Sequence, residues 1–432
     1  MRPHSTPLST SAWLALFSYV FSVSAMAQNA EPFPTPSSKK GLQVQMVDDA
    51  IVLGIRHATL NVSLGALFHL EEKPGATKYL HEGRPFWLNT NYVRSLDADV
   101  KPLSDAGIVI YLIVLAYPTK DAAKDAVLLH PKRREDGKFN IAAFNTATEE
   151  GTRLYRALIA FLAERYSGAH PEAGRVWGWI IGNEVNSQWL WYNMGRAPLA
   201  EVCSEYERAV RAAHEEVSRH VPHARCYLSF DHHWKTAMPG ISDQEAYRTK
   251  DFLDTFAKLA RERGDFAWHV AHHPYPDNLG NPRTWEDKAA WTTDDSPHIT
   301  FKNLEVACRA MLKPELLWQG KPRRIILSEQ GIHCLDKPEG EHLQAAGFVY
   351  AWEKVQRQPG IDAMIWHRHV DHAHEGGLRL GLWTLKPGSV NTPEQKRLIY
   401  GLFQKADTAA WSAQAAEFLR VVGLSSWDEL TK

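Results

Sequence analysis

Short apolar segments alternate with longer amphipathic segments along most of this 432-residue chain. The apolar segments have the composition of buried strands, and the amphipathic segments have the periodicity of helices. A strand followed by a helix and a further strand indicates a parallel βαβ unit, because parallel strands need a crossover connection. The expected strands are 42–46, 57–62, 108–115, 176–181, 225–230, 266–271, 323–328 and 362–366, and the expected helices are 93–106, 147–166, 199–220, 243–263, 299–312 and 341–356.

Eight such strands predict a fold of the α/β class, a single (β/α)8 TIM barrel with long βα loops. A doubly wound open sheet is the alternative. Four segments that follow strands are long for connections, and the first of them contains a predicted hairpin at 78–89. In a barrel these loops gather at the carboxyl ends of the strands, where barrel enzymes build their sites. The long segments are 63–91, 117–145, 185–198 and 272–298.

The N-terminus has the layout of a secretory signal peptide, with a weakly basic lead, an apolar run at 12–25 and the small-x-small sequence Ala-Met-Ala at 25–27. We therefore expect export to the periplasm or the medium. The predicted organisation is a signal peptide, a Pro- and Ser-rich leader and one catalytic domain, at 1–27, 28–40 and 41–432.

The charge balance excludes some partners. Forty-nine basic and fifty acidic side chains give a formal net charge of −1, so no basic field is available for nucleic acid. After the N-terminal run, no segment is apolar for long enough to insert into a membrane. The sixteen tryptophans are unusual, and we consider two interpretations: core packing, or aromatic faces that stack on the sugar rings of a poly- or oligosaccharide.

Two glutamates stand at the ends of apolar strands. Glu184 follows the fourth expected strand in the sequence GWIIGNEVN, and Glu329 follows the seventh in IILSEQG. In a barrel both would lie on the same face and point toward each other across the mouth. Cleavage of a glycosidic bond needs two such carboxylates, one protonated as the acid and one ionised. The structural alternative for each is a residue that braces a turn.

The sequence GWIIGNEVN resembles the fourth-strand motif of the clan A retaining glycoside hydrolases, and LSEQG resembles their motif after strand seven. The resemblance implies that Glu184 is the acid/base, that Glu329 is the nucleophile and that Asn183 holds the sugar 2-hydroxyl. It further implies that Tyr275 hydrogen-bonds the nucleophile and that Trp366 forms the platform under the sugar.

One position departs from the clan. Many clan members carry an arginine at the end of strand two, beside the nucleophile, and Asn61 stands there in this chain. Either another cation replaces the arginine, or the chain is a distant branch. The whole sequence is most similar to a group of bacterial proteins classed as a domain of unknown function with a clan A-like barrel.

Histidines follow three of the expected strands. They occur at 232–233 directly after Asp231, at 272–273, and in the run HRHVDHAH at 367–374. We interpret Asp231, His232 and His273 as residues that hydrogen-bond sugar hydroxyls, and we predict neither a metal nor another cofactor.

Two alternatives to a glycosidase remain. Imidazoles on adjacent strand ends are typical zinc ligands, so a zinc-dependent hydrolase is one. A carbohydrate-binding barrel without catalysis is the other, supported by Asn61. No H-E-x-x-H, G-x-S-x-G, P-loop or dinucleotide-binding motif occurs.

Overall fold

A computed structural model describes residues 31–136, 139 and 141–431. Within them eight parallel strands form a closed barrel in chain order, so the predicted (β/α)8 architecture is confirmed. The predicted signal peptide at 1–27 lies outside the described residues. The barrel strands are β1 (Lys40–Gln43), β2 (His57–Ser63), β6 (Val109–Leu115), β7 (Gly178–Ile181), β8 (Arg225–Phe230), β9 (Trp268–His272), β10 (Ile325–Leu327) and β11 (Ile361–Trp366).

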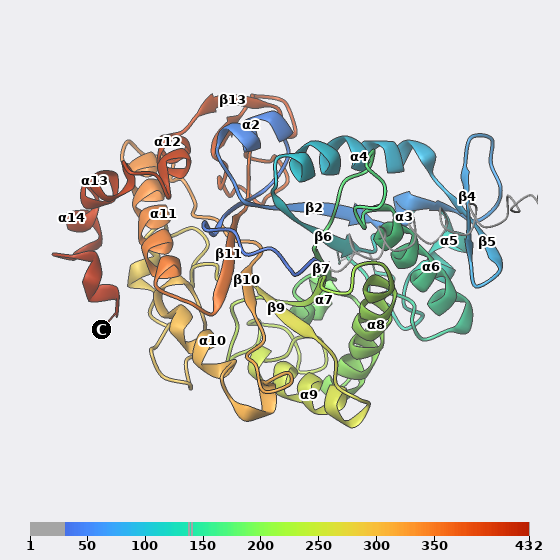
Figure 1. Cartoon of the computed structure of the whole chain (residues 1–432). Coiled ribbons are helices and arrows are strands. Elements are labelled where there is room, and N and C mark those ends of the chain that lie inside the picture. The colour runs from blue at the N-terminus through green and yellow to red at the C-terminus, as the bar shows by residue number, and fades with distance from the viewer. Residues whose placement is uncertain (1–30, 137–138, 140, 432) are drawn as a thin grey trace, which may run out of the picture.

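Helices surround the barrel strands (Figure 1). The α6 helix begins two residues later than predicted, at Glu149, because the Thr148 side chain accepts a hydrogen bond from the Gly151 backbone N–H and caps the helix, and two glutamates occupy its first turn. The larger outer helices are α4 (Thr90–Asp105), α6 (Glu149–Arg165), α8 (Leu199–His220), α9 (Thr249–Glu262), α10 (Leu304–Ala310) and α11 (Gly340–Gln356), and shorter ones are α2 (Val47–Val52), α3 (Leu64–Leu67), α5 (Ala122–Leu128), α7 (Gln188–Trp191), α12 (Leu398–Lys405), α13 (Trp411–Ala416) and α14 (Leu419–Val422).

Large side chains fill the barrel interior. All seven residues of β6 are buried, as expected for a strand covered on both faces. The ring of Tyr111 on this strand lies against Gly178 of β7 so closely that a Cβ at position 178 would come within 1.9 Å of it. The Tyr111 ring also packs edge-on against Tyr227 of β8. At the level of Tyr111 the barrel interior is therefore filled by packed side chains.

Two small sheets stand outside the barrel. The predicted hairpin is present as β4 (Thr77–His81) and β5 (Arg84–Leu88), which pair antiparallel and are joined by β3 (Phe68–His69). The second sheet pairs β12 (Trp383–Leu385) with β13 (Pro393–Lys396). All four cysteines are free thiols. Among the described residues, no helix combines the length and the apolar character that a membrane span requires.

The predicted helix at 243–263 is too long at its N-terminus, because α9 begins only at Thr249. The preceding residues are held by neighbouring loops instead. The Glu245 carbonyl accepts a hydrogen bond from the Trp189 N–H, and the Tyr247 N–H donates to the Asn186 carbonyl. These tertiary contacts hold residues 243–248 in a non-helical conformation.

Candidate functional site

A cavity of about 560 Å³ lies at the carboxyl ends of the barrel strands. Every barrel strand, or the segment that follows it, contributes to its wall. The predicted site residues that line it are Asn61, Asn183, Glu184, Asp231, His232, Tyr275 and Glu329. The structure therefore brings together residues that are far apart in the sequence.

Glu184 lies two residues after Gly182, at the turn where β7 passes into a short helical segment. Its backbone is left-handed, with φ 39° and ψ 52°, which is uncommon for a residue with a side chain. Such strain is typical of functional sites, where it holds a side chain in one direction. The Glu184 N–H donates to the Ser229 Oγ on β8 at 3.1 Å, which fixes this turn against the next strand.

His273 contacts the Glu184 carboxylate from behind the cavity wall. Its Nδ1 lies 2.8 Å from Glu184 Oε1, and its Nε2 lies 3.0 Å from Ser328 Oγ. Burial raises the pKa of Glu184, and the hydrogen bond from His273 opposes that effect without cancelling it. Burial also favours the neutral form of His273, but its hydrogen bond to Glu184 and the charge of Glu329 outweigh burial, so the pKa of His273 is raised.

Glu329 follows β10 and faces Glu184. One carboxylate oxygen of each residue and one ring nitrogen of His273 all lie within 4.8 Å of one another. The Tyr275 hydroxyl donates a hydrogen bond to Glu329 Oε1 at 3.1 Å. This is the contact that the resemblance to clan A implied. Burial and the charge of Glu329 together raise the pKa of Tyr275, so its hydroxyl keeps its proton and remains a donor.

Asn61 occupies the end of β2, where many clan A enzymes have arginine. Its Oδ1 accepts a hydrogen bond from Gln43 Nε2 at 3.1 Å, and Gln43 Oε1 also contacts Nδ1 of His367. These three side chains form a polar row along one side of the cavity. His273, which follows β9, is coupled by charge to both Glu184 and Glu329.

Asp231 is a buried carboxylate with several donors. Its Oδ1 accepts from Asn186 Nδ2 at 2.6 Å and from the His233 N–H at 2.8 Å, and its Oδ2 accepts from the Ser187 hydroxyl. Burial alone would raise its pKa, but the contact with His233 and the other donors hold the pKa far below its ordinary value. Asp231 therefore braces the turn after Glu184 in addition to lining the cavity.

Two residues that were predicted to contact the sugar, Trp366 and His273, do not line the cavity. Trp366 is fully buried, its ring packs edge-on against Phe348 of α11 and its Nε1 donates to the Leu380 carbonyl, so it belongs to the core. His273 is only 2 % exposed and contacts Glu184 rather than open space. Sequence reasoning missed two aromatic residues that do line the cavity, Tyr117 and Trp191. They lie in two of the long segments that follow strands, 117–145 and 185–198, and the length of these segments was the available signal.

The three histidine clusters do not meet at one point. His272 Nε2 contacts the buried Ile299 carbonyl, and His369 Nε2 contacts Asp49, both away from the cavity. Two groups in the described parts of the chain have metal-ligand spacing: one is Glu184, His273 and Glu329, and the other is His232, His233 and His298. His298 was not predicted from the sequence.

Two solved structures illustrate the similarity of this chain to known folds. A family 39 glycoside hydrolase from Bacteroides cellulosilyticus WH2 has a TM-score of 0.54 at 12 % identity, over 88 % of this chain and 64 % of the other, so this chain spans less than two thirds of that protein. Fpglu1 from Fervidobacterium pennivoraus has a TM-score of 0.55 at 11 % identity, over 89 % of this chain and 85 % of the other. At such identity the likeness shows the fold alone.

No curated protein sequence matches this chain. A protein-family model does match, over residues 32–430. The match covers nearly all of the described residues and agrees with the resemblance noted in the sequence, a clan A-like barrel of unassigned role. The chain belongs to the family of unknown function DUF5722.

Proposed function

We propose that this protein is a retaining glycoside hydrolase that cleaves β-linked poly- or oligosaccharides, with Glu184 as acid/base and Glu329 as nucleophile. The observation that carries the proposal is the approach of the two carboxylates to within 4.8 Å in a cavity at the strand ends. Retaining enzymes hold their carboxyl groups about 5 Å apart, whereas inverting enzymes leave a wider gap for a water molecule.

The environments of the two acids differ in the way the reaction requires. Glu184 is 8 % exposed, and burial raises its pKa, which suits a group that must carry a proton. Glu329 is more exposed and accepts a hydrogen bond from the Tyr275 hydroxyl. Unequal environments of this kind support Glu184 as the acid and Glu329 as the nucleophile.

The reaction proceeds in two displacements. Glu329 attacks the anomeric carbon while Glu184 gives its proton to the departing glycosidic oxygen, which leaves a glycosyl ester on Glu329. Glu184 then takes a proton from water, and the resulting hydroxide equivalent displaces Glu329 from the sugar. The net result is addition of one water across the bond, with both acids returned to their initial states.

The cavity supplies groups suited to a sugar. Asn183, Asn61 and His232 offer polar atoms for hydroxyls, and Trp191 offers an aromatic face for the apolar side of a pyranose. A volume of about 560 Å³ lies in the range of pockets that hold small ligands. We further propose that the protein is exported, which N-terminal sequencing of the mature form tests by finding a start near Gln28.

The direct test is a panel of aryl β-glycosides and polysaccharides with the wild type, Glu184→Gln and Glu329→Gln. The exposed residue Glu339 provides the matched control Glu339→Gln. We expect Glu329→Gln to abolish turnover, and Glu184→Gln to spare only the first displacement on substrates whose leaving group needs no proton. Proton NMR of the first product should show the β anomer. Turnover that survives in both variants, or sugar binding without any hydrolysis by the wild type, contradicts the proposal.

Azide separates the two roles. In Glu329→Ala an azide ion can fill the space of the lost carboxylate, attack the sugar directly and give a product of inverted configuration. In Glu184→Ala it can attack the glycosyl-enzyme without base assistance and give a β-glycosyl azide. If Glu184→Ala gave the inverted product and Glu329→Ala gave the β-glycosyl azide, Glu184 would be the nucleophile and Glu329 the acid/base.

A further inference from the structure

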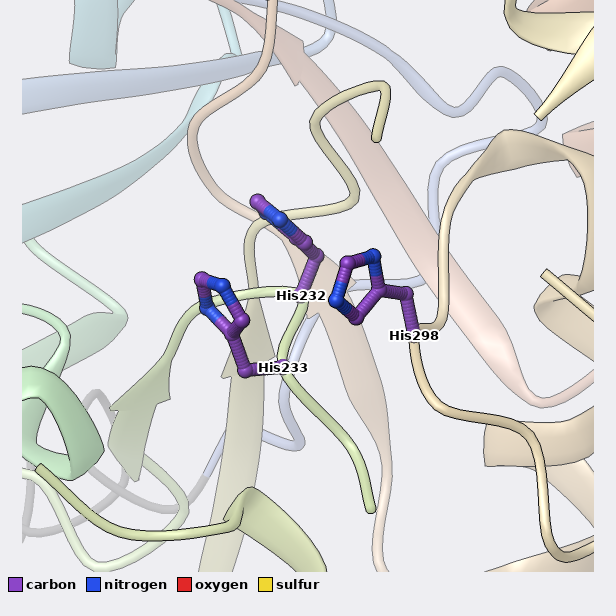
Figure 2. A group of neighbouring side chains, drawn as sticks. All are labelled: His232, His233 and His298. Carbon is purple, nitrogen blue, oxygen red and sulfur yellow. The ribbon is translucent and has the colours of Figure 1, made fainter. Parts of the chain in front are cut away.

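Three imidazole rings face one another beside the cavity (Figure 2). His232 and His233 follow β8, and His298 ends the long segment after β9. A backbone bridge joins His233 to His298, and the Ile299 N–H donates to the His232 carbonyl at 2.9 Å. The ring centroids are separated by 4.3 Å for His232–His233, 4.9 Å for His232–His298 and 5.0 Å for His233–His298.

Carboxylates lie behind two of these rings. Nδ1 of His298 lies 2.8 Å from Asp277 Oδ1, and this contact orients the ring so that Nε2 is the nitrogen available to a ligand. Nδ1 of His233 lies 3.1 Å from Asp231 Oδ2 but is not aligned for a hydrogen bond with it. A carboxylate behind an imidazole fixes the ring and its tautomer and makes the opposite nitrogen a better ligand, and metal-binding histidines almost always have such a partner.

The ring of His232, like that of His233, has a buried nitrogen without a hydrogen-bond partner among the described residues. In His232 this atom is Nδ1. A buried polar atom without a partner is costly, and a bound ion is one of the few groups that removes the cost.

We propose that His232, His233 and His298 bind one divalent transition-metal ion of the zinc class. One ring nitrogen of each residue lies within 4.8 Å of the other two. Tetrahedral zinc with bonds of about 2.1 Å needs nitrogens about 3.4 Å apart, which small rotations of the side chains supply. Three imidazole nitrogen ligands favour Zn²⁺, Ni²⁺ or Cu²⁺ over Ca²⁺ and Mg²⁺, which prefer oxygen.

The ion would connect the segment after β8 to the end of the segment after β9. Two of its ligands, His232 and His233, line the cavity that contains Glu184 and Glu329. The ion would therefore lie at the cavity wall and stabilise it. The other group with metal-ligand spacing is less suitable, because His273 is already bonded through both ring nitrogens to Glu184 and Ser328.

The test measures metal binding and does not depend on hydrolysis. Protein without a histidine tag is stripped with chelator and dialysed, and ZnCl2 is titrated in by calorimetry, with metal content measured by mass spectrometry. We expect one equivalent of Zn²⁺ and a higher melting temperature, with no corresponding binding of CaCl2. His232→Ala and His298→Ala should weaken binding at least 100-fold. The exposed residue His223 gives the matched control His223→Ala, which should bind as the wild type does.

Circular dichroism and melting in chelator establish that each variant folds. If an alanine variant is unfolded, Asp277→Asn provides the test instead. This change keeps an oxygen behind His298 but removes the negative charge, so the affinity for Zn²⁺ should fall about 10- to 100-fold. Absence of a zinc equivalent in the wild type, or equal binding by wild type and both folded histidine variants, overturns the proposal. Loss of the metal site with normal glycoside hydrolysis leaves the proposed function intact, and the reverse result leaves the metal site intact.

Discussion

His273 Nδ1 lies 2.8 Å from Oε1 of Glu184, so an imidazole from the end of β9 is bonded directly to the carboxylate that follows β7. Two opposing effects act on Glu184. Burial favours the protonated acid, and the hydrogen bond from His273 favours the carboxylate. The proton affinity of the proposed acid is therefore set by the balance between them, and His273 is a positioning residue that adjusts it.

Replacing His273 should raise the pKa of Glu184, because burial then acts without the opposing hydrogen bond. The general acid must be protonated, so the alkaline limb of kcat/KM should move to higher pH in His273→Ala. His273→Gln can still donate from its side-chain amide and should move the limb less. The measurement is a pH profile on a substrate with a poor leaving group. A limb that stays in place or moves to lower pH contradicts this role.

Removing the Tyr275 hydroxyl should impair the proposed nucleophile. The hydrogen bond to Glu329 spans 3.1 Å, and bonds to charged groups contribute about 1.5–3 kcal/mol, so kcat/KM of Tyr275→Phe should fall roughly 10- to 100-fold. Tyr79→Phe is a matched control, because the Tyr79 hydroxyl also donates to a carboxylate at 3.1 Å, that of Glu164 at the surface. Equal kinetics for Tyr275→Phe and the wild type would show that the bond has no catalytic role.

Much of the fold could be predicted from the sequence, because apolar runs and helical periodicity are local patterns. The run at 108–115 is apolar throughout and became β6, and the periodic segment 199–220 became α8 with the same bounds. The pairing of Glu184 with Glu329 was also predictable, because both follow strands whose carboxyl ends meet on one barrel face. The alternation of strands with helices, and the positions at which the strands end, were sufficient to predict these features.

The predictions failed where the direction of one side chain decides whether that residue reaches the cavity. Successive side chains of a strand point to opposite faces, so Trp366 at the end of β11 packs against a helix while the next residue, His367, reaches the cavity. Sequence does not show which of the two faces inward. His298 lies at the end of a long irregular segment, where no periodicity predicts its neighbours, and only the folded structure brings it to His232.

The two tryptophans should respond differently to substitution. Trp191→Ala removes a cavity wall and should raise KM with little change in melting temperature. Trp366→Ala removes a fully buried ring and should reduce the free energy of unfolding by about 3–5 kcal/mol. Denaturant unfolding and steady-state kinetics on both variants check this. An unfolding free energy unchanged in Trp366→Ala, or an unchanged KM in Trp191→Ala, would restore Trp366 as a candidate for the platform.

Asp287 should make the protein less stable as pH rises. Burial, assisted by the charge of Asp277, raises the pKa of Asp287 to about 7 despite hydrogen bonds from Thr300 and Thr284. Between about pH 4 and pH 7 the folded state keeps this proton and the unfolded state has lost it, so the free energy of unfolding falls across that window. Above about pH 7 both states are ionised, and the loss is complete.

The neutral variant Asp287→Asn lacks this titration. It should match the wild type at about pH 4 and exceed it at about pH 8, by up to about 4 kcal/mol, since each pKa unit corresponds to about 1.4 kcal/mol. Urea unfolding at several pH values between these limits gives the difference directly. Asp295→Asn is the control, because Asp295 is exposed and should show no such trend. A difference between Asp287→Asn and the wild type that is constant with pH would indicate a packing effect and exclude a buried proton at Asp287.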